Sequence, residues 1–256
     1  MTDQDPTGIG AKYDRIAAEY SKSIELPLRA HFDEPSLLRL AEPLDGKSVL
    51  DLACGDGHYT RLVKQAGAGE ALGIDLSREM VALAEAEERR TPIGCDYQMG
   101  NASNLALGRT FDLVVSVYLL NYARTKAELL DFCSTIRRHL KPGGRFAALT
   151  LNITLDPAHY ADGKHYGVWF TGPAQPQEGD PLTVHIANTD GSTASFDNYY
   201  LKPETYAQAF AEAGLQDFAW HPLQVSKEGL AAFPAGYWDS ARAYPITIGV
   251  VARRGA

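Results

Sequence analysis

The chain has 256 residues, of which 45% are apolar and 22% charged, and its net charge is −8. This composition is that of a globular protein with a sizeable core, and the acidic balance argues against a nucleic-acid-binding surface, which would be basic. Residues 1–10 carry no apolar signal segment, and no run approaches the roughly 18 apolar residues of a membrane span. Cys54, Cys95 and Cys133 lack the spacing of metal ligands. We therefore expect a cytoplasmic protein with reduced thiols and no metal site, which binds neither nucleic acid nor membranes.

Residues 12–44 predict two helices ahead of the first strand. Apolar residues at helical spacing share one face of the first helix, and Pro27 interrupts the pattern before a second short helix from Pro35 to Leu40. We expect both helices to pack on the rest of the fold. Arg29, between them, is expected to be exposed to solvent.

The stretch from Val49 to Thr60 organises the rest of the chain. An apolar run from Val49 to Ala53 predicts a strand buried on both faces, and Gly55-Asp56-Gly57 follows it directly. Glycine allows the tight turn and lets a ligand approach bare backbone. A helix from Tyr59 to Ala66 comes next. Strand, glycine turn and helix together predict a nucleotide-type site at the carboxyl edge of a parallel sheet.

The residues of this turn distinguish between possible ligands. A dinucleotide site usually has a third glycine where this chain has Thr60. Asp51 and Asp56 flank the turn and would repel a diphosphate, whereas they suit a ligand with an ammonium and a second cationic centre. S-adenosylmethionine has both charges and no phosphate. An NAD-dependent dehydrogenase remains the less favoured alternative.

A second apolar strand ends at Asp75, about 20 residues beyond the turn, where an acid can accept hydrogen bonds from both ribose hydroxyls. Ser77 is also a good N-cap for the helix that follows. Both functions are compatible, since Ser77 can cap the helix while Asp75 binds ribose.

The acid, three residues and glycine-x-glycine of Asp51–Gly57 resemble motif I of the class I S-adenosylmethionine-dependent methyltransferases. The string Leu140–Gly144 resembles the segment before their fifth strand. The resemblance implies one α/β domain with a three-layer Rossmann-like fold, whose seven-stranded, mostly parallel sheet has an antiparallel last strand. It divides the chain into a helical lid (1–44), a cofactor-binding core (45–151), a loop and hairpin insertion that caps the substrate (152–200), and a C-terminal helix with two strands (201–256).

The same resemblance implies which residues bind the cofactor. Tyr20 is the first candidate for the methionine carboxylate and Tyr13 the second. Arg29 could pair with the same carboxylate, although a solvated arginine is favoured. Asn101 stands where the family usually has an acid that accepts from the adenine amine, and its amide oxygen can do the same. The full set of expected cofactor residues is Tyr13, Tyr20, Asp51, Ala53, Gly55, Gly57, Asp75, Leu76, Met80, Asn101, Ala102, Val117 and Tyr122.

A fourth strand, Phe111–Val117, ends beside the expected position of the reacting methyl group. The residues after it, Tyr118–Tyr122, lack the acid or asparagine, two prolines and aromatic residue of enzymes that methylate nucleic-acid bases. The insertion is rich in aromatic and acidic residues, and a hairpin is expected from Leu182–Ala187 and Ser195–Leu201. Such a surface suits a neutral or cationic planar substrate better than a phosphorylated one. Ordinary packing of the insertion against the sheet explains the same composition equally well. Expected substrate residues are Tyr118, Asn121, Tyr166, Trp169 and Trp238.

More narrowly, the chain resembles toxoflavin-synthase-like N-methyltransferases. The resemblance implies N-methylation, or O-methylation, of a small planar secondary metabolite by in-line transfer. A ring nitrogen needs little beyond orientation, whereas a hydroxyl acceptor needs a base. Tyr118, His159 and His165 are the catalytic candidates. A protein that binds S-adenosylmethionine without transferring its methyl group is the alternative.

Overall fold

The computed structural model describes residues 8, 10, 11, 14, 26–187 and 191–256. Its main sheet has seven strands in the order β3-β2-β1-β4-β5-β10-β9. The first five strands in this order, from β3 through β1 to β5, run parallel to one another. The strand β10 is antiparallel to both β5 and β9. This confirms the expected sheet. The strands are β1 (Ser48–Leu52), β2 (Glu70–Asp75), β3 (Cys95–Met99), β4 (Phe111–Val117), β5 (Leu140–Leu151), β9 (Leu215–His221) and β10 (Thr247–Arg254).

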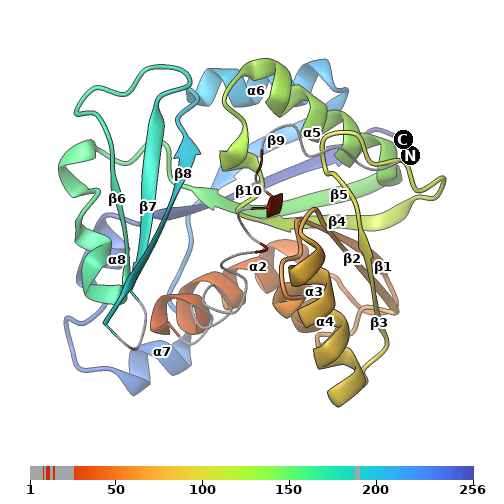
Figure 1. Cartoon of the computed structure of the whole chain (residues 1–256), viewed down its shortest axis with the longest axis horizontal. Coiled ribbons are helices and arrows are strands. Elements are labelled where there is room, and N and C mark those ends of the chain that lie inside the picture. Colours follow the sequence, from red (N-terminus) through yellow and green to blue (C-terminus); the bar gives the residue numbers. More distant parts are fainter. Residues whose placement is uncertain (1–7, 9, 12–13, 15–25, 188–190) are drawn as a thin grey trace.

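Helices cover both faces of this sheet, as Figure 1 shows. One face is packed by α2 (Glu34–Ala41), α3 (His58–Gln65) and α4 (Arg78–Arg90), and the other by α5 (Lys126–His139) and α6 (Pro203–Glu212). Neighbouring residues Val49 and Leu50 of β1 are both fully buried, one in each core cluster. The apolar run therefore forms a strand buried on both sides, as its sequence predicts. No helix in the described part of the chain is long and apolar enough to cross a bilayer.

Local sequence explains where the helices begin and end. The hydroxyl of Ser77 accepts a hydrogen bond from the Met80 amide at 3.2 Å, so Ser77 is the expected N-cap of α4. The helix α5 ends at His139 and β5 begins at Leu140, so the string Leu140–Gly144, expected before the fifth strand, belongs to the strand itself. Leu140 pairs with Phe111, and the register shifts before the next pair. The glycine-rich segment after α5 is thus an irregular start of the strand.

The insertion forms a second sheet of three antiparallel strands, β6 (Val168–Thr171), β7 (Pro181–Ala187) and β8 (Thr193–Tyr199), beside the main sheet in Figure 1. The pairing of β7 with β8 confirms the expected hairpin. The sequence did not predict β6, because it is short and lies between loops rich in glycine and proline. The short elements are η3 (Leu120–Tyr122), η4 (Pro157–His159), η5 (Asp162–Tyr166), α7 (Lys227–Ala232) and α8 (Asp239–Ala243).

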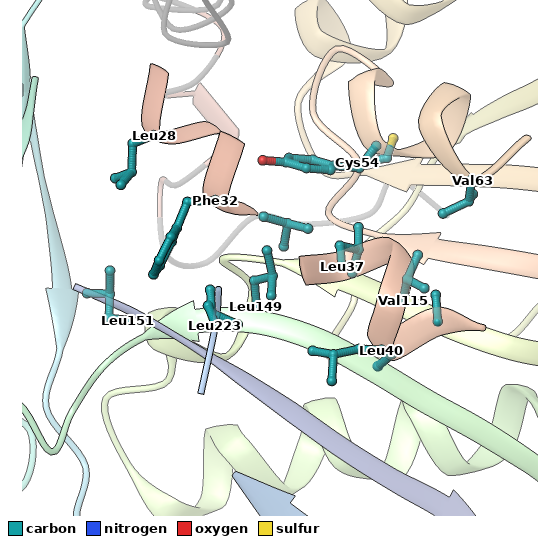
Figure 2. Packing of buried hydrophobic residues seen from close by; sticks show 14 of the residues in the cluster. Leu28, Phe32, Leu37, Leu40, Cys54, Val63, Val115, Leu149, Leu151 and Leu223 are labelled. Carbon is teal, nitrogen blue, oxygen red and sulfur yellow. The ribbon is translucent and has the colours of Figure 1, made fainter. Parts of the chain in front are cut away.

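A five-residue π-helix, η2 (Arg29–Asp33), leads into α2 and lies against the inner face of the small sheet. Figure 2 shows Leu28 and Phe32 near Leu151 of β5, and all three belong to one buried cluster. Arg29 is only 5% exposed, so the expectation that it is solvated was wrong. The small sheet covers this segment, which the helical pattern of residues 12–44 alone could not indicate.

Candidate functional site

A cavity of about 280 Å³ lies at the carboxyl ends of β1, β2 and β4. This volume is near the lower end of the roughly 300–1,000 Å³ typical of small-molecule pockets. The cavity lies at the edge of the sheet where doubly wound α/β proteins bind their ligands. The structure brings together there nine of the expected cofactor residues and one expected substrate residue: Ala53, Gly55, Asp75, Leu76, Met80, Asn101, Ala102, Val117, Tyr122 and Tyr118.

The turn between β1 and α3 exposes backbone to this cavity. Ala53, Gly55 and Gly57 all have positive φ, of 60°, 57° and 83°. A Cβ added at Gly55 would meet no atom within 4 Å, so the backbone there is open to a ligand. A Cβ at Gly57 would instead lie 2.6 Å from the Tyr97 hydroxyl. Gly57 does not line the cavity, and packing explains why glycine stands there.

Asp75 is held rigidly at the wall of the cavity. One carboxylate oxygen accepts the Gly55 amide N–H at 2.8 Å and the other accepts the Ser77 amide N–H at 2.8 Å. Burial raises the pKa of Asp75, while these N–H groups oppose the rise. Each carboxylate oxygen has a second lone pair, so Asp75 can still accept bonds from ligand hydroxyls. The glycine turn and the end of β2 are thereby fixed to each other.

Asp51 lies behind this wall and does not line the cavity. It is 1% exposed, and its carboxylate accepts a hydrogen bond from the Thr60 hydroxyl at 2.7 Å. Burial raises the pKa of Asp51 to about 7, and the charge of Asp75 adds to the rise. The residue at the third-glycine position, Thr60, therefore has a structural role, which is to tie α3 to β1.

Asn101 lines the cavity, but its amide oxygen is already engaged. That oxygen accepts bonds from the Ser103 amide at 2.9 Å and from the Ser103 hydroxyl at 2.8 Å. Two bonds use both of its lone pairs. The oxygen expected to accept from an adenine amine is thus bound within the chain, which leaves the amide nitrogen of Asn101 for a ligand.

Tyr118 separates the cavity from a second, smaller chamber and lines both. It follows β4 with a left-handed φ of 63°, and its hydroxyl donates to the Asp33 carboxylate at 2.6 Å. The Thr247 hydroxyl oxygen lies 3.1 Å from the hydroxyl oxygen of Tyr118. Burial raises the pKa of Tyr118 far above its usual value. Burial also raises the pKa of Asp33 to about 6, against the lowering effect of Arg29.

Sequence reasoning missed Asp33. Its position is compatible with the apolar side of a helix, since Leu28, Phe32 and Leu37 recur around it at helical spacing and are all buried. An acid among such residues is a recognisable pattern, because a buried carboxylate needs a partner. The partner, Tyr118, follows β4 and is far away in the sequence.

The remaining expected residues lie elsewhere. Tyr166 and Trp238 stack on each other with ring centroids 5.4 Å apart, and Trp169 stacks on His185 at 5.1 Å. Asn121 is fully buried, with its amide oxygen accepting from the Thr150 hydroxyl at 3.1 Å. None of the four expected substrate residues Asn121, Tyr166, Trp169 and Trp238 lines the cavity.

The two histidine candidates also lie outside the cavity. His159 stacks on Tyr244 with centroids 3.4 Å apart and pairs with Asp162 at 2.8 Å, while His165 packs edge-on against Tyr166. The structure therefore brings neither histidine to the carboxyl edge of the sheet. Tyr13 and Tyr20 lie outside the described residues.

The chemistry of the lining favours a cationic ligand without phosphates. The described residues that line the cavity include Asp75, Glu128 and Asp131, and no lysine, arginine or histidine is among them. A pyrophosphate would meet repulsion there, whereas an ammonium and a sulfonium would be attracted. The open backbone at Gly55 and the fixed carboxylate of Asp75 fit the amino-acid and ribose parts of S-adenosylmethionine.

Comparison with known proteins gives concordant results. Residues 49–144 match the methyltransferase domain family. The chain is 31% identical over 122 residues to a ubiquinone biosynthesis O-methyltransferase of Rhizobium johnstonii, an alignment covering 47% of this chain and 48% of that protein. The chain thus spans about half the length of the curated relatives it matches.

Solved structures share the fold over nearly the whole chain. The CcbJ methyltransferase of Streptomyces caelestis has a TM-score of 0.64 and 21% identity, covering 99% of this chain and 100% of that one. An S-adenosylmethionine-dependent methyltransferase of Mesorhizobium loti has a TM-score of 0.63 and 21% identity, covering 91% and 100%. Residues 49–144 therefore match a methyltransferase domain, and the chain has the fold of solved S-adenosylmethionine-dependent methyltransferases.

Proposed function

We propose that the protein transfers a methyl group from S-adenosylmethionine to a nitrogen or oxygen atom of a small, neutral or cationic molecule. The observation that carries this proposal is the cavity beside Asp75 and Gly55, which is lined by acids and, within the described chain, by no basic residue. The names of the relatives, O-methyltransferases among them, support methyl transfer. The net charge of −8 favours a small-molecule acceptor over a nucleic acid.

The roles of the cavity residues follow from their positions. Asp75 would accept hydrogen bonds from the ribose hydroxyls, and the open turn at Gly55 would contact the amino-acid portion. Leu76, Met80 and Ala102 would enclose the adenine, with the amide nitrogen of Asn101 donating to it. S-adenosylmethionine supplies an activated methyl group on a good leaving group. The protein's main contribution would be to hold the acceptor in line with that methyl group.

The first test is the substitution Asp75→Ala. It removes the acceptors for the ribose hydroxyls, and bonds to a charged group contribute roughly 1.5–3 kcal/mol. We expect the affinity for S-adenosylhomocysteine, measured by calorimetry, to fall about 10- to 100-fold. The matched control is Asp96→Ala, because Asp96 is exposed on the neighbouring strand β3. Unchanged affinity in Asp75→Ala would reject the ribose-binding role.

Mass spectrometry of candidate acceptors tests the transfer itself. Planar nitrogen heterocycles and phenols should gain the mass of one methyl group when incubated with the protein and S-adenosylmethionine. Tight cofactor binding without methylation of any acceptor across a broad panel would favour a protein that binds S-adenosylmethionine without transferring its methyl group.

A further inference from the structure

The second chamber lies between the two sheets. Its apolar walls come from the inner face of the small sheet, from Leu28 before η2 and from Leu151 at the end of β5. Strand alternation explains the inner face, since Val184 and Ile186 of β7 point the same way as Phe196 and Asn198 of the paired strand β8. Tyr118 forms the wall shared with the cofactor cavity.

Besides Arg29, which also lines the chamber, two polar groups there have an atom with no hydrogen-bond partner among the described residues. One such atom is Oδ1 of Asp33, an acceptor, and the other is Nδ2 of Asn198, a donor. Asp33 is fully buried and Asn198 is 1% exposed. Leaving such a buried group unpaired is unfavourable, because it loses its hydrogen bonds to water and gains none in the fold. Two of them in one chamber therefore indicate a guest that satisfies both.

The size of the chamber limits what that guest can be. Its volume is about 20 Å³, and about 10–15 Å³ is enough for one water molecule. A hydroxyl group occupies a similar space, and it donates one hydrogen bond while accepting another. It therefore matches Oδ1 of Asp33 and Nδ2 of Asn198 in both size and polarity.

We propose that the chamber receives a hydroxyl group of the methyl acceptor, which donates to Asp33 and accepts from Asn198 while the rest of the acceptor lies on the Tyr118 side. This inference rests on the proposed methyltransferase function and specifies its substrate as a hydroxyl-bearing, mainly apolar molecule. Asp33 and Asn198 are then determinants of specificity. Tyr118 holds the carboxylate of Asp33 in place through its hydrogen bond of 2.6 Å.

Phenol and toluene are suitable probes, because they differ only by a hydroxyl in place of a methyl group. Saturating S-adenosylhomocysteine would occupy the cofactor's part of the cavity, and NMR of ¹³C-labelled methyl groups would follow each titration. The methyl groups of Val184, Ile186 and Ile246 line the chamber and would report binding there. We expect phenol to shift these signals at a concentration at least tenfold lower than toluene.

The substitution Asn198→Leu keeps the branched shape of the side chain and removes the donor. It should reduce the preference for phenol to less than threefold. Asp197→Leu is the matched control, because the neighbouring side chain is exposed on the other face of β8, and this variant should keep the preference. The comparison of the two probes in the unsubstituted protein stands even where a variant fails to fold.

Three outcomes would overturn the inference. They are an absence of shifts at the chamber, equal binding of phenol and toluene, and a phenol preference that survives Asn198→Leu. The last two would mean that Oδ1 of Asp33 and Nδ2 of Asn198 form hydrogen bonds to an enclosed water molecule instead. If S-adenosylhomocysteine binds and these outcomes occur, only the chamber assignment fails. If S-adenosylhomocysteine does not bind, the proposed function fails first.

Discussion

Asp51 shows how the most recognisable acid of a motif can have a role away from the ligand. It is buried behind the glycine turn, and its bond to Thr60 joins the first strand to the following helix. An ionised carboxylate at such a site is costly because water is excluded. The charge that the sequence suggests for cofactor binding thus bears first on the stability of the fold.

Burial raises the pKa of Asp51 from its ordinary value of 3.8 to about 7. The folded state therefore binds the proton of the Asp51 carboxyl group more tightly than the unfolded state does. The resulting stabilisation is complete below about pH 4 and is lost as the pH rises through about 7. Asp33, with its pKa raised to about 6, acts in the same direction. Stability should therefore fall between pH 4 and pH 8.

We expect Asp51→Asn to flatten that fall. The amide retains an acceptor for Thr60 and carries no charge, so roughly 1–4 kcal/mol of pH-dependent stability should disappear. Urea unfolding at pH 5 and pH 8 measures the difference, and Asp197→Asn on the exposed face of β8 controls for the substitution itself. A slope equal to that of the unsubstituted protein would show that Asp51 titrates normally in the fold.

At the scale of single elements, the glycine turn combines two requirements. Gly55 faces the cavity with open space at its Cβ position, whereas the Cβ position of Gly57 is filled by the Tyr97 ring. Both have positive φ, which costs other residues about 1–2 kcal/mol. One glycine is therefore needed by the ligand and the other by the packing of α3 on β3.

This difference predicts that two alanine substitutions rank in opposite order for loss of stability and for loss of cofactor binding. Gly57→Ala should lower the free energy of unfolding by roughly 2–4 kcal/mol, because strain is added to a clash with Tyr97. Gly55→Ala should cost only about 1–2 kcal/mol from strain, but its methyl group should weaken S-adenosylhomocysteine binding more than Gly57→Ala does. Urea unfolding and calorimetry measure the two quantities. Equal losses of stability in the two variants would contradict this division.

The elements that the sequence predicts best are those whose signal is local. The apolar runs of β1 and β4, the glycine turn and the Ser77 cap each depend on a few adjacent residues, and all of them appear in the structure. The chamber could not be predicted in this way. Asp33 and Asn198 are single polar residues in distant elements, and only the packing of the small sheet on η2 brings them together.

The aromatic residues expected at the substrate site were inferred from composition rather than from a local sequence pattern. Tyr166 and Trp238 are aromatic residues of loops and short helices, and they stack on each other rather than facing the cavity. Composition alone indicates that aromatic rings must be buried somewhere, but it does not distinguish a binding wall from packing between α8 and η5.

At the scale of the whole molecule, two sheets share one core around η2 and Tyr118. The small sheet and the α2 face of the main sheet belong to the same cluster of buried residues, so the insertion is part of the fold rather than a detached cap. Figure 1 shows it beside the end of the main sheet at which the cofactor cavity opens. The arrangement sets a cofactor cavity and a smaller chamber on opposite sides of one tyrosine.

The central claim is that the cavity beside Asp75 binds S-adenosylmethionine. The most direct measurement is calorimetric titration of the purified protein with S-adenosylhomocysteine, with NAD as the comparison ligand. We expect micromolar binding of S-adenosylhomocysteine and no heat from NAD, because the acids at the cavity repel a diphosphate. Binding of NAD with no binding of S-adenosylhomocysteine would contradict the assignment of the cofactor and of every residue role derived from it.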